Sequence, residues 1–579
     1  MKTSGKAFAL FLSLALAACG SSQTPRDAGP DGDGEAADGG DLFGTDQGDG
    51  GEDGGDEAID CAAYLFEDVS IPTRDGKALA AFVRRPANSA CRLPAILIQT
   101  PYNKENARSM WFAHPENEPL FGSRDYAFVV VDWRGFFGSK DAAVSGTQPY
   151  AQDGYDVVEW IASQAWSDGK VGTWGVSALC QQQWRTAVQR PPHLSALVPI
   201  FCQANQTYTQ YYPGGVLRKE YFDFISAYFG IDILKDHPLR DNLWRLAETL
   251  IDLGKVSAPA LVVAGWYDLY NAGTLRDFEA VRTTSNAAIR EKHRLLVGPW
   301  IHFAVGGESS GAGRELDAQE KLFVDADKTI QRDSLLFFDF HLRGIQNQAA
   351  AWPEARWTLG GAGGEESGTW PPAGLERVYY LVSGGSLSES APQAASVSFP
   401  FDPDDPSPTV GGQTLLPTLR HGPRLQDEVL ARADALSFVG PELSAPLTVR
   451  GRMTVELAVS TTGADTDFAV RLTDVGPDGK HLLIADGIRR LKLREDFSQT
   501  SPVVSGERYA LTVDMVNDLG YRFAAGHRVG LIVTGSNYPR FERNPNNGEH
   551  FYADAASSVA VTETLYLDGT SRLVLSLGE

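Results

Sequence analysis

The segment GTWGVSALCQQQW, residues 172–184, carries the most informative pattern in this chain. A strand-like run ends at Ser177, and the residues after it follow a helical pattern. In the G-x-S-x-G motif, a serine flanked by glycines lies on a sharp turn between a strand and a helix. Gly175 occupies the first glycine position here, but Leu179 occupies the second. Ser177 therefore has the context of a nucleophile without the complete motif, and an ordinary serine at a strand-to-helix junction is the alternative.

Strands and helices alternate on both sides of this segment. Short apolar runs end in turn residues, as buried parallel strands do, at 93–102, 126–135, 258–268 and 293–302. Helical spacing of apolar residues appears between these runs. The alternation predicts a doubly wound α/β domain, which we assign to residues 61–350.

An aromatic-rich, helix-like segment at residues 203–255 interrupts the alternation. An insertion at this place lies above the carboxyl edge of the sheet, where such folds bind ligands. We therefore expect a helical cap over the binding site, with a plain packing excursion as the alternative. Its aromatic residues include Tyr208, Tyr211, Tyr212, Tyr221, Phe222, Phe224, Tyr228 and Phe229.

The composition changes after about residue 350. Gly, Pro and Ser become more frequent, and segments of alternating polarity appear at 377–383, 453–461 and 527–536. Such short strands separated by turns are typical of a β-sandwich. We expect a C-terminal jelly-roll domain over residues 351–579.

The first 18 residues have the pattern of an export signal. Two lysines precede an apolar run that is too short to span a bilayer. The run ends in LAAC, which resembles a bacterial lipobox whose cysteine, Cys19 here, is lipidated. We expect an exported lipoprotein anchored in the outer membrane, since Gly20 follows the cysteine, facing either periplasm or exterior. An ordinary signal peptide with a cysteine near its cleavage site is the alternative.

Residues 19–60 are predicted to form a disordered acidic tether. Between residues 20 and 60 there are 13 Asp and Glu against one Arg, with almost no apolar side chains. This segment holds about half of the net charge of −23, and that charge argues against a nucleic-acid partner. Its repeated Asp-Gly does not match the spacing of an EF-hand loop, so no metal site is predicted.

Four cysteines remain if Cys19 is lipidated: Cys61, Cys91, Cys180 and Cys202. An even number in an exported protein is compatible with two disulfides. Pairing of nearest neighbours would join Cys61 to Cys91 and Cys180 to Cys202, although sequence alone leaves the connectivity open.

A catalytic serine needs a histidine to take its proton and an acid to orient that histidine. In α/β-hydrolases the chain order is Ser, then Asp or Glu, then His, with the last two at the ends of later strands. Asp268 and His302 each follow the end of such a strand, whereas His293 opens its strand at the opposite edge. The order therefore predicts a triad of Ser177, Asp268 and His302.

Several motifs together resemble the family of cocaine esterase and Xaa-Pro dipeptidyl-peptidases, which includes α-amino-acid ester hydrolases. In the first part of the chain they are WGVSALC, AGWYD, VGPWIH, TPYNK, DWRGFFGS and FFDFHLRG. In the C-terminal part they are FDPDDPSPTVGG, TDFAVRLTDVGPDGK and SNYPRFERNPNNG. The resemblance runs from about residue 65 to the end, and it implies an α/β-hydrolase domain, a short helical cap and a jelly-roll domain.

The resemblance also implies roles for individual residues. The family turn is G-x-S-Y-x-G, so Ser177 aligns as the nucleophile, Asp268 as the orienting acid and His302 as the base. Ala178 replaces the tyrosine, and its backbone N–H remains an oxyanion donor. Tyr102 in TPYNK matches the tyrosine that supplies the second donor, with packing at a strand end as the alternative.

Cys180 stands where the family has a glycine. It is either a small residue filling that space or a second nucleophile, and a position one helical turn beyond the serine points away from the cleft.

The implied activity is hydrolysis through an acyl-enzyme, with no metal or organic cofactor. The expected substrate is a small ester, amide or short peptide. Trp133, Phe136 and Trp266, with the cap aromatics, favour an apolar acyl or aromatic group in the substrate. No acidic cluster for a free amine is evident, which disfavours the alternative of an Xaa-Pro dipeptidyl-peptidase. A further alternative is a non-catalytic surface lipoprotein whose β-sandwich binds glycan or protein, and the sequence leaves the oligomeric state open.

Overall fold

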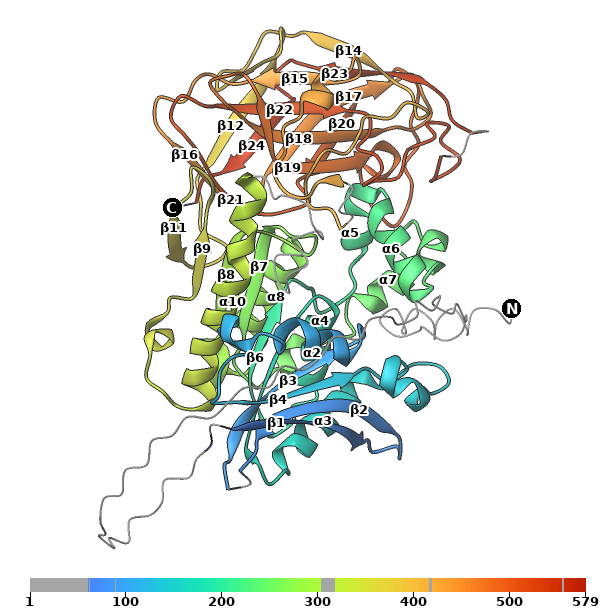
Figure 1. Ribbon diagram of the computed structural model, residues 1–579. Helices are drawn as coiled ribbons and strands as arrows, with labels where there is room; N and C mark the ends of the chain where they lie inside the picture. The colour runs from blue at the N-terminus through green and yellow to red at the C-terminus, as the bar shows by residue number, and fades with distance from the viewer. Residues whose placement is uncertain are drawn as a thin grey trace, which may run out of the picture.

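The computed structural model describes residues 61, 63–88, 90–302, 318–415, 419–553 and 557–578. For residues 318–325 it describes the backbone only. The predicted signal peptide, Cys19 and the acidic tether lie outside the described residues. Figure 1 shows an α/β domain at one end, a β-rich domain at the other and a group of short helices at the side between them.

A ten-stranded sheet forms the core of the α/β domain, in the order β1-β2-β4-β3-β5-β6-β7-β8-β9-β11. Its strands are β1 (Tyr64–Pro72), β2 (Ala78–Pro86), β3 (Leu93–Thr100), β4 (Ala127–Asp132), β5 (Ser167–Val176), β6 (Leu194–Ile200), β7 (Leu261–Tyr267), β8 (Arg294–Ile301), β9 (Ala355–Thr358) and β11 (Glu365–Gly368). The pairs from β4 to β9 are parallel, and β1, β2 and β11 join antiparallel. The central strands are buried on both faces, which explains their continuous apolar sequences. The predicted α/β-hydrolase fold is confirmed.

Helices cover both faces of this sheet. The longer ones are α2 (Lys104–Trp111), α3 (Tyr150–Ala162), α4 (Ala178–Ala187), α8 (Asn271–Thr284) and α10 (Ala318–Leu342), and the short α9 (Ala287–Arg290) follows α8. In β5 the Thr173 hydroxyl donates a hydrogen bond to Gln183 of α4, at 2.9 Å. The indole Nε1 of the next residue, Trp174, donates to Ser334 of α10 at 3.1 Å. Because successive strand residues point to opposite faces, α4 and α10 lie on opposite sides of the sheet.

Gln183 ties α4 to the two strands beneath it. Its Nε2 donates to the carbonyls of Gly175 and Val198, at 3.1 and 3.0 Å. Its Oε1 accepts from the Thr173 hydroxyl and from the backbone N–H of Val198. The side chain is 3% exposed. All four hydrogen-bonding positions of this buried amide are therefore occupied, and they hold the start of α4 in register with β5 and β6.

The described part of the chain contains two disulfides. One joins Cys61 to Cys91, with 5.8 Å between Cα atoms. The other joins Cys180, in the first turn of α4, to Cys202, just beyond β6, with 6.0 Å between Cα atoms. Both half-cystines of the second bond are completely buried. The covalent link thus fastens the helix that begins at Ser177 to the neighbouring strand end.

The segment between β6 and β7 forms the group of helices seen at the side in Figure 1. Its α-helices are α5 (Tyr208–Tyr211), α6 (Lys219–Phe229) and α7 (Asn242–Ala247), and its 3-10 turns are η3 (Pro213–Gly215), η4 (Ile233–Asp236) and η5 (Leu253–Lys255). Its aromatic side chains form a separate core that includes Tyr208, Tyr212 and Trp244. This core also packs against Leu269 and Tyr270, which follow β7.

The C-terminal region is a β-sandwich, as predicted. An eleven-stranded sheet runs β14-β23-β17-β24-β12-β13-β15-β22-β18-β19, with β20 paired to β17, and a small sheet runs β10-β21-β16. The strands are β10 (Gly360–Gly361), β12 (Glu376–Val382), β13 (Ser386–Ser388), β14 (Ser396–Phe401), β15 (Leu436–Val439), β16 (Leu447–Gly451), β17 (Thr454–Thr461), β18 (Asp467–Val475), β19 (His481–Arg490), β20 (Tyr509–Asp514), β21 (Leu519–Phe523), β22 (Arg528–Thr534), β23 (Val561–Tyr566) and β24 (Arg572–Ser576). Of the three segments with alternating polarity in the sequence, β12 alternates between buried and half-buried residues in its second half, whereas β22 is buried along almost its whole length.

The two domains do not meet at a single point near residue 350, because strands of both domains alternate along the chain there. Both β9 and β11 continue the ten-stranded sheet beyond that residue, whereas β10, between them, pairs with β21 of the second domain. The chain therefore crosses between domains more than once before the sandwich proper begins at β12. Within the described residues, no helix is both long and apolar enough to cross a membrane.

We predict that replacing Gln183 with leucine destabilises the folded protein by on the order of 3 kcal/mol, because buried backbone groups of Gly175 and Val198 lose their partners. Denaturant unfolding of the purified proteins measures the difference. Gln189→Leu, the same change at an exposed position just beyond α4, is the matched control. Unfolding of the Gln183 variant within about 0.5 kcal/mol of wild type, the usual range for surface changes, would contradict this role.

Candidate active site

Ser177 occupies a strained turn between β5 and α4. Its backbone has φ 59° and ψ −120°, an arrangement that L-residues rarely adopt. Its N–H donates to the carbonyl of Ile200 at 3.0 Å. Gly175 lies two residues earlier, where an added Cβ would approach Leu179 Cβ to 2.5 Å. The glycine is therefore required by the close approach of strand and helix, and the turn lifts the serine side chain above the sheet.

Asp268 and His302 follow the ends of the neighbouring strands β7 and β8. His302 Nδ1 and Asp268 Oδ2 are 2.5 Å apart. The second carboxylate oxygen accepts the backbone N–H of Tyr270 at 2.7 Å. Asp268 is completely buried and His302 is 6% exposed. The carboxylate is thus fixed at both oxygens, and it can hold the imidazole in one orientation.

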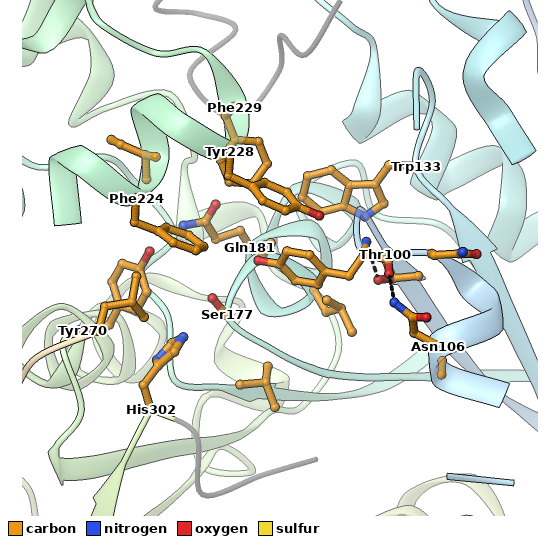
Figure 2. A pocket seen from close by; sticks show the side chains of 18 of the residues that line it. Thr100, Asn106, Trp133, Ser177, Gln181, Phe224, Tyr228, Phe229, Tyr270 and His302 are labelled. Carbon is orange, nitrogen blue, oxygen red and sulfur yellow. Dashed lines mark hydrogen bonds between the residues drawn. The ribbon is translucent and has the colours of Figure 1, made fainter. Parts of the chain in front are cut away.

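The structure brings the three predicted triad residues to one place. Ser177 and His302 line the same cavity, and Figure 2 shows their side chains pointing toward one another. Asp268 lies behind His302, away from the cavity. All three stand at the carboxyl edge of the sheet, and they come from the ends of β5, β7 and β8.

The two predicted oxyanion donors also lie at this cavity. Ala178 is the first residue of α4, and the first N–H groups of a helix have no partner inside the helix. Tyr102 lines the cavity two residues beyond β3, and its N–H donates to Thr100 Oγ1 at 2.9 Å. Its ring packs against Tyr228 of α6, with 5.8 Å between centroids. Strand β3 and the cap helix together position this phenol.

The remaining candidates lie away from the chemistry. Cys180 is bonded to Cys202, so it holds no free thiol that could act as a second nucleophile. His293 lies at the opposite end of β8, where its Nδ1 accepts the backbone N–H of Ala260 at 3.1 Å. Burial lowers the pKa of His293 to about 3. It is therefore a neutral structural histidine.

The cavity has a volume of about 800 Å³, and many of the residues that line it are aromatic. Rings from the α/β domain and from the cap surround it, as Figure 2 shows for several of them. They include Trp133, Phe137, Phe224, Tyr228, Phe229 and Tyr270. Trp266, which we expected among these rings, is instead buried, and its Nε1 donates to the carbonyl of Thr358 at 2.8 Å. Phe136 packs behind Trp133 and Phe229.

The lining carries little charge. Among the described residues that line the cavity there is no Asp, Glu, Lys or Arg. Burial raises the pKa of Tyr211 and Tyr270 well above the ordinary value, so both phenols stay neutral. The described residues also contain no group of three His, Cys, Asp or Glu side chains that could hold a metal ion. The site therefore suits an uncharged or aromatic group next to the serine.

Several lining residues were not singled out from the sequence. Tyr270 lies two residues after Asp268, and Gln181 lies one helical turn after Ser177, so proximity to the motifs could have suggested both. Leu415 comes from the C-terminal domain, far away along the chain. No sequence signal places it beside the serine.

The chain matches family models in both of its domains. The description "X-Pro dipeptidyl-peptidase (S15 family)" applies to residues 75–229 and 223–304. The description "X-Pro dipeptidyl-peptidase C-terminal non-catalytic domain" applies to residues 347–574. The cocaine esterase of Rhodococcus sp. (strain MB1 Bresler) is 32% identical over 556 residues, which span 85% of this chain and 94% of that protein.

Solved structures share the fold over nearly the whole chain. An α-amino acid ester hydrolase has a TM-score of 0.75 at 23% identity, covering 91% of this chain and 98% of its own. A CocE/NonD family hydrolase from Staphylococcus aureus has a TM-score of 0.65 at 21% identity, covering 89% of this chain and 94% of its own. With these folds and a relative above 30% identity along most of its length, the chain belongs to the CocE/NonD type of the X-Pro dipeptidyl-peptidase S15 family and is a serine hydrolase.

Proposed function

We propose that this protein hydrolyses carboxylic esters through an acyl-enzyme on Ser177, with His302 as general base and Asp268 as the acid that orients it. The observation that carries the proposal is the arrangement of the three side chains. They follow three strands of one sheet edge in the order Ser, Asp, His, with a 2.5 Å contact between imidazole and carboxylate. Ser177 and His302 face one aromatic cavity.

The reaction runs in two halves. His302 takes the proton of the Ser177 hydroxyl as its oxygen attacks the ester carbonyl, and the imidazolium is stabilised by Asp268. The Ala178 N–H and the Tyr102 hydroxyl stabilise the oxyanion of the tetrahedral intermediate. The intermediate then collapses: His302 protonates the leaving oxygen, the alcohol departs, and the acyl group stays on Ser177. Water activated by His302 attacks the acyl-enzyme, and release of the carboxylic acid restores the serine.

Two observations favour esters over Xaa-Pro peptides. A dipeptidyl-peptidase must bind the free amine of its substrate, and a buried amine needs a carboxylate partner. No carboxylate lines the cavity among the described residues. In addition, the relative at 32% identity is named a cocaine esterase. The dipeptidyl-peptidase activity in the family description is therefore the second candidate.

We predict that a fluorophosphonate probe labels the wild-type protein at Ser177, because the probe reacts with serines activated by a neighbouring base. The Ser177→Ala variant is expected to take no label and to lose at least 10³-fold in kcat on 4-nitrophenyl esters, the scale expected for loss of a triad nucleophile. Peptide mass spectrometry locates the adduct, and steady-state kinetics measures the loss. Ser163→Ala, at an exposed serine after α3, is the control. Normal turnover by Ser177→Ala would exclude the mechanism.

We predict that Tyr102→Phe lowers kcat by roughly 10²-fold, because one of two oxyanion donors is lost. KM should change far less, since the phenol is expected to bind the transition state more strongly than the ester. Tyr155→Phe removes a phenol hydroxyl outside the cavity and serves as the control. If Tyr102→Phe raises KM and leaves kcat unchanged, the phenol packs against the substrate and does not stabilise the oxyanion.

We predict that acetyl and benzoyl esters are hydrolysed with at least 10²-fold higher kcat/KM than Ala-Pro or Gly-Pro 4-nitroanilides. The expected cause is the lack of a carboxylate partner for the peptide amine, which costs several kcal/mol when the amine is buried unpaired. Parallel kinetic assays at one pH measure the ratio. Blocking the amine by acetylation is the control, since it should not lower the anilide rates further. Preference for the free-amine anilides would assign the dipeptidyl-peptidase activity instead.

A further inference from the structure

An arginine lies behind one wall of the cavity, two helical turns beyond the serine. Arg185 follows Ser177 by eight residues along α4, about 12 Å in an α-helix. Its Nη2 donates to Gln181 Oε1 at 3.4 Å, and its guanidinium carbon lies 5.6 Å from the ring centroid of Trp133. Gln181 and Trp133 both line the cavity. Arg185 itself is thus in contact with two residues that face the substrate.

The charge of Arg185 has no carboxylate partner among the described residues. The ionisable side chains that act on it are the phenols of Tyr150 and Tyr211. Burial raises the pKa of both phenols, so they stay neutral near pH 7. Burial also lowers the pKa of Arg185 to about 10, which leaves the guanidinium cationic. Its Nη1 is buried without a hydrogen-bond acceptor in the described part of the chain. A positive charge therefore stands behind this wall without a counter-ion.

Arg185 fixes the orientation of the Gln181 amide. A guanidinium has five N–H donors and no acceptor, so the amide atom that faces it must be the oxygen. The Nε2 group, on the other branch of the same planar amide, is left for the cavity that Gln181 lines (Figure 2). Gln181 is four residues from Ser177, about 6 Å along the helix axis. The wall thus offers N–H donors to a group a few bonds away from the scissile ester.

Trp133, against which the guanidinium of Arg185 packs, carries a second donor without a partner in the part of the chain that the structure describes. The indole Nε1 of Trp133 is buried and has no hydrogen-bond partner among the described residues. Buried donors without partners are rare in folded proteins. The Nε1 of Trp133 and the Nη1 of Arg185 come from two neighbouring side chains. Neither atom has surface open to the cavity, so Arg185 acts by its positive charge from behind the wall, and the Gln181 amide is the polar group of this wall that can meet a substrate.

We propose that Gln181, oriented by Arg185, determines substrate specificity by binding a carboxylate carried by the ester substrate. The proposal rests on the proposed esterase function. The preferred substrates are half-esters or other esters with an anionic group about 6–12 Å from the scissile bond, the reach of Gln181 and Arg185 along α4. The aromatic rings enclose the apolar part of such a molecule, and the donor wall binds its charged end. Arg185 is a positioning residue: it orients the Gln181 amide and attracts the carboxylate through the electric field of its charge.

Two matched pairs of esters test the proposal. On the acyl side, 4-nitrophenyl hydrogen adipate is compared with 4-nitrophenyl methyl adipate. On the alcohol side, 4-carboxyphenyl hexanoate is compared with its methyl ester. The measured quantity is the ratio of kcat/KM for the carboxylate to kcat/KM for the methyl ester within one enzyme preparation. This ratio is independent of the fraction of folded protein, so a variant that folds poorly still gives an answer.

We predict that Arg185→Gln and Gln181→Leu each lower this ratio by roughly 10-fold or more in one pair, the scale of a hydrogen bond to a charged group. Gln181→Glu should lower it further, because the new carboxylate would pair with Arg185 and repel the substrate. Arg190→Gln removes the same charge from an exposed position just beyond α4 and is the matched control. Its ratio should equal that of wild type.

The outcomes separate this proposal from the esterase function itself. If wild type labels at Ser177 and hydrolyses the methyl esters, but the three variants keep both ratios within about 2-fold of wild type, only the specificity proposal fails. A proportional fall for both members of each pair would likewise overturn it and assign Arg185 a purely structural role. Without labelling and turnover in wild type, the esterase function and the specificity proposal fail together.

Discussion

The unusual backbone conformation of Ser177 governs the geometry of the whole site. A residue with φ 59° and ψ −120° costs on the order of 1–3 kcal/mol, and it persists only where its surroundings determine it. Here a disulfide and buried hydrogen bonds determine it. The Cys180–Cys202 bond fastens the first turn of α4, and Gln183 satisfies groups of β5 and β6. Rigid support on both sides of the serine offsets the strain, and the side chain stays aimed into the cavity.

The disulfide also explains the unusual residue in the turn. A glycine at position 180 would leave room for strand and helix to approach, whereas a half-cystine fills that space and adds a bond across it. Cys180 is completely buried, so its side chain replaces a void with contacts. Cys180, which stands where the family turn has a glycine, therefore holds the same backbone through its bond to Cys202.

The β-sandwich takes part in the site by contacting the end of β7 and the start of α8. The carbonyl of Trp266 accepts the amides of Gln413 and Asn517, at 3.2 and 3.1 Å, and the N–H of Asp518 donates to Asn271 at 3.0 Å. These contacts flank Asp268 on both sides along the chain. Leu415 adds an apolar side chain to the cavity itself. Asp268 is thus held between two domains, which is a physical reason for them to occur together in one chain.

The fold and the residues brought together at the cavity could be predicted from sequence because their signals are local. Buried parallel strands read as apolar runs, and Ser177, Asp268 and His302 each follow one. Signals between distant segments were missed: Leu415 reaches the cavity from another domain, and Trp266 turns away from it to bond Thr358. The spacing of Gln181 and Arg185 on one helix face was visible in the sequence. Only the structure shows that this face meets the cavity without a carboxylate to neutralise it.

The two sides of the cavity differ in whether their polar groups already have hydrogen-bond partners in the protein. On the cap side, the phenols bond to protein groups: Tyr221 and Tyr270 share a hydrogen bond of 2.5 Å, and Tyr211 donates to Gln206 at 2.6 Å. With their hydroxyls occupied, these residues present mainly ring surface to a ligand. On the α4 side the buried donors are in excess. We therefore expect the cap to select esters by their shape, and the helix that carries the nucleophile to select them by their charge.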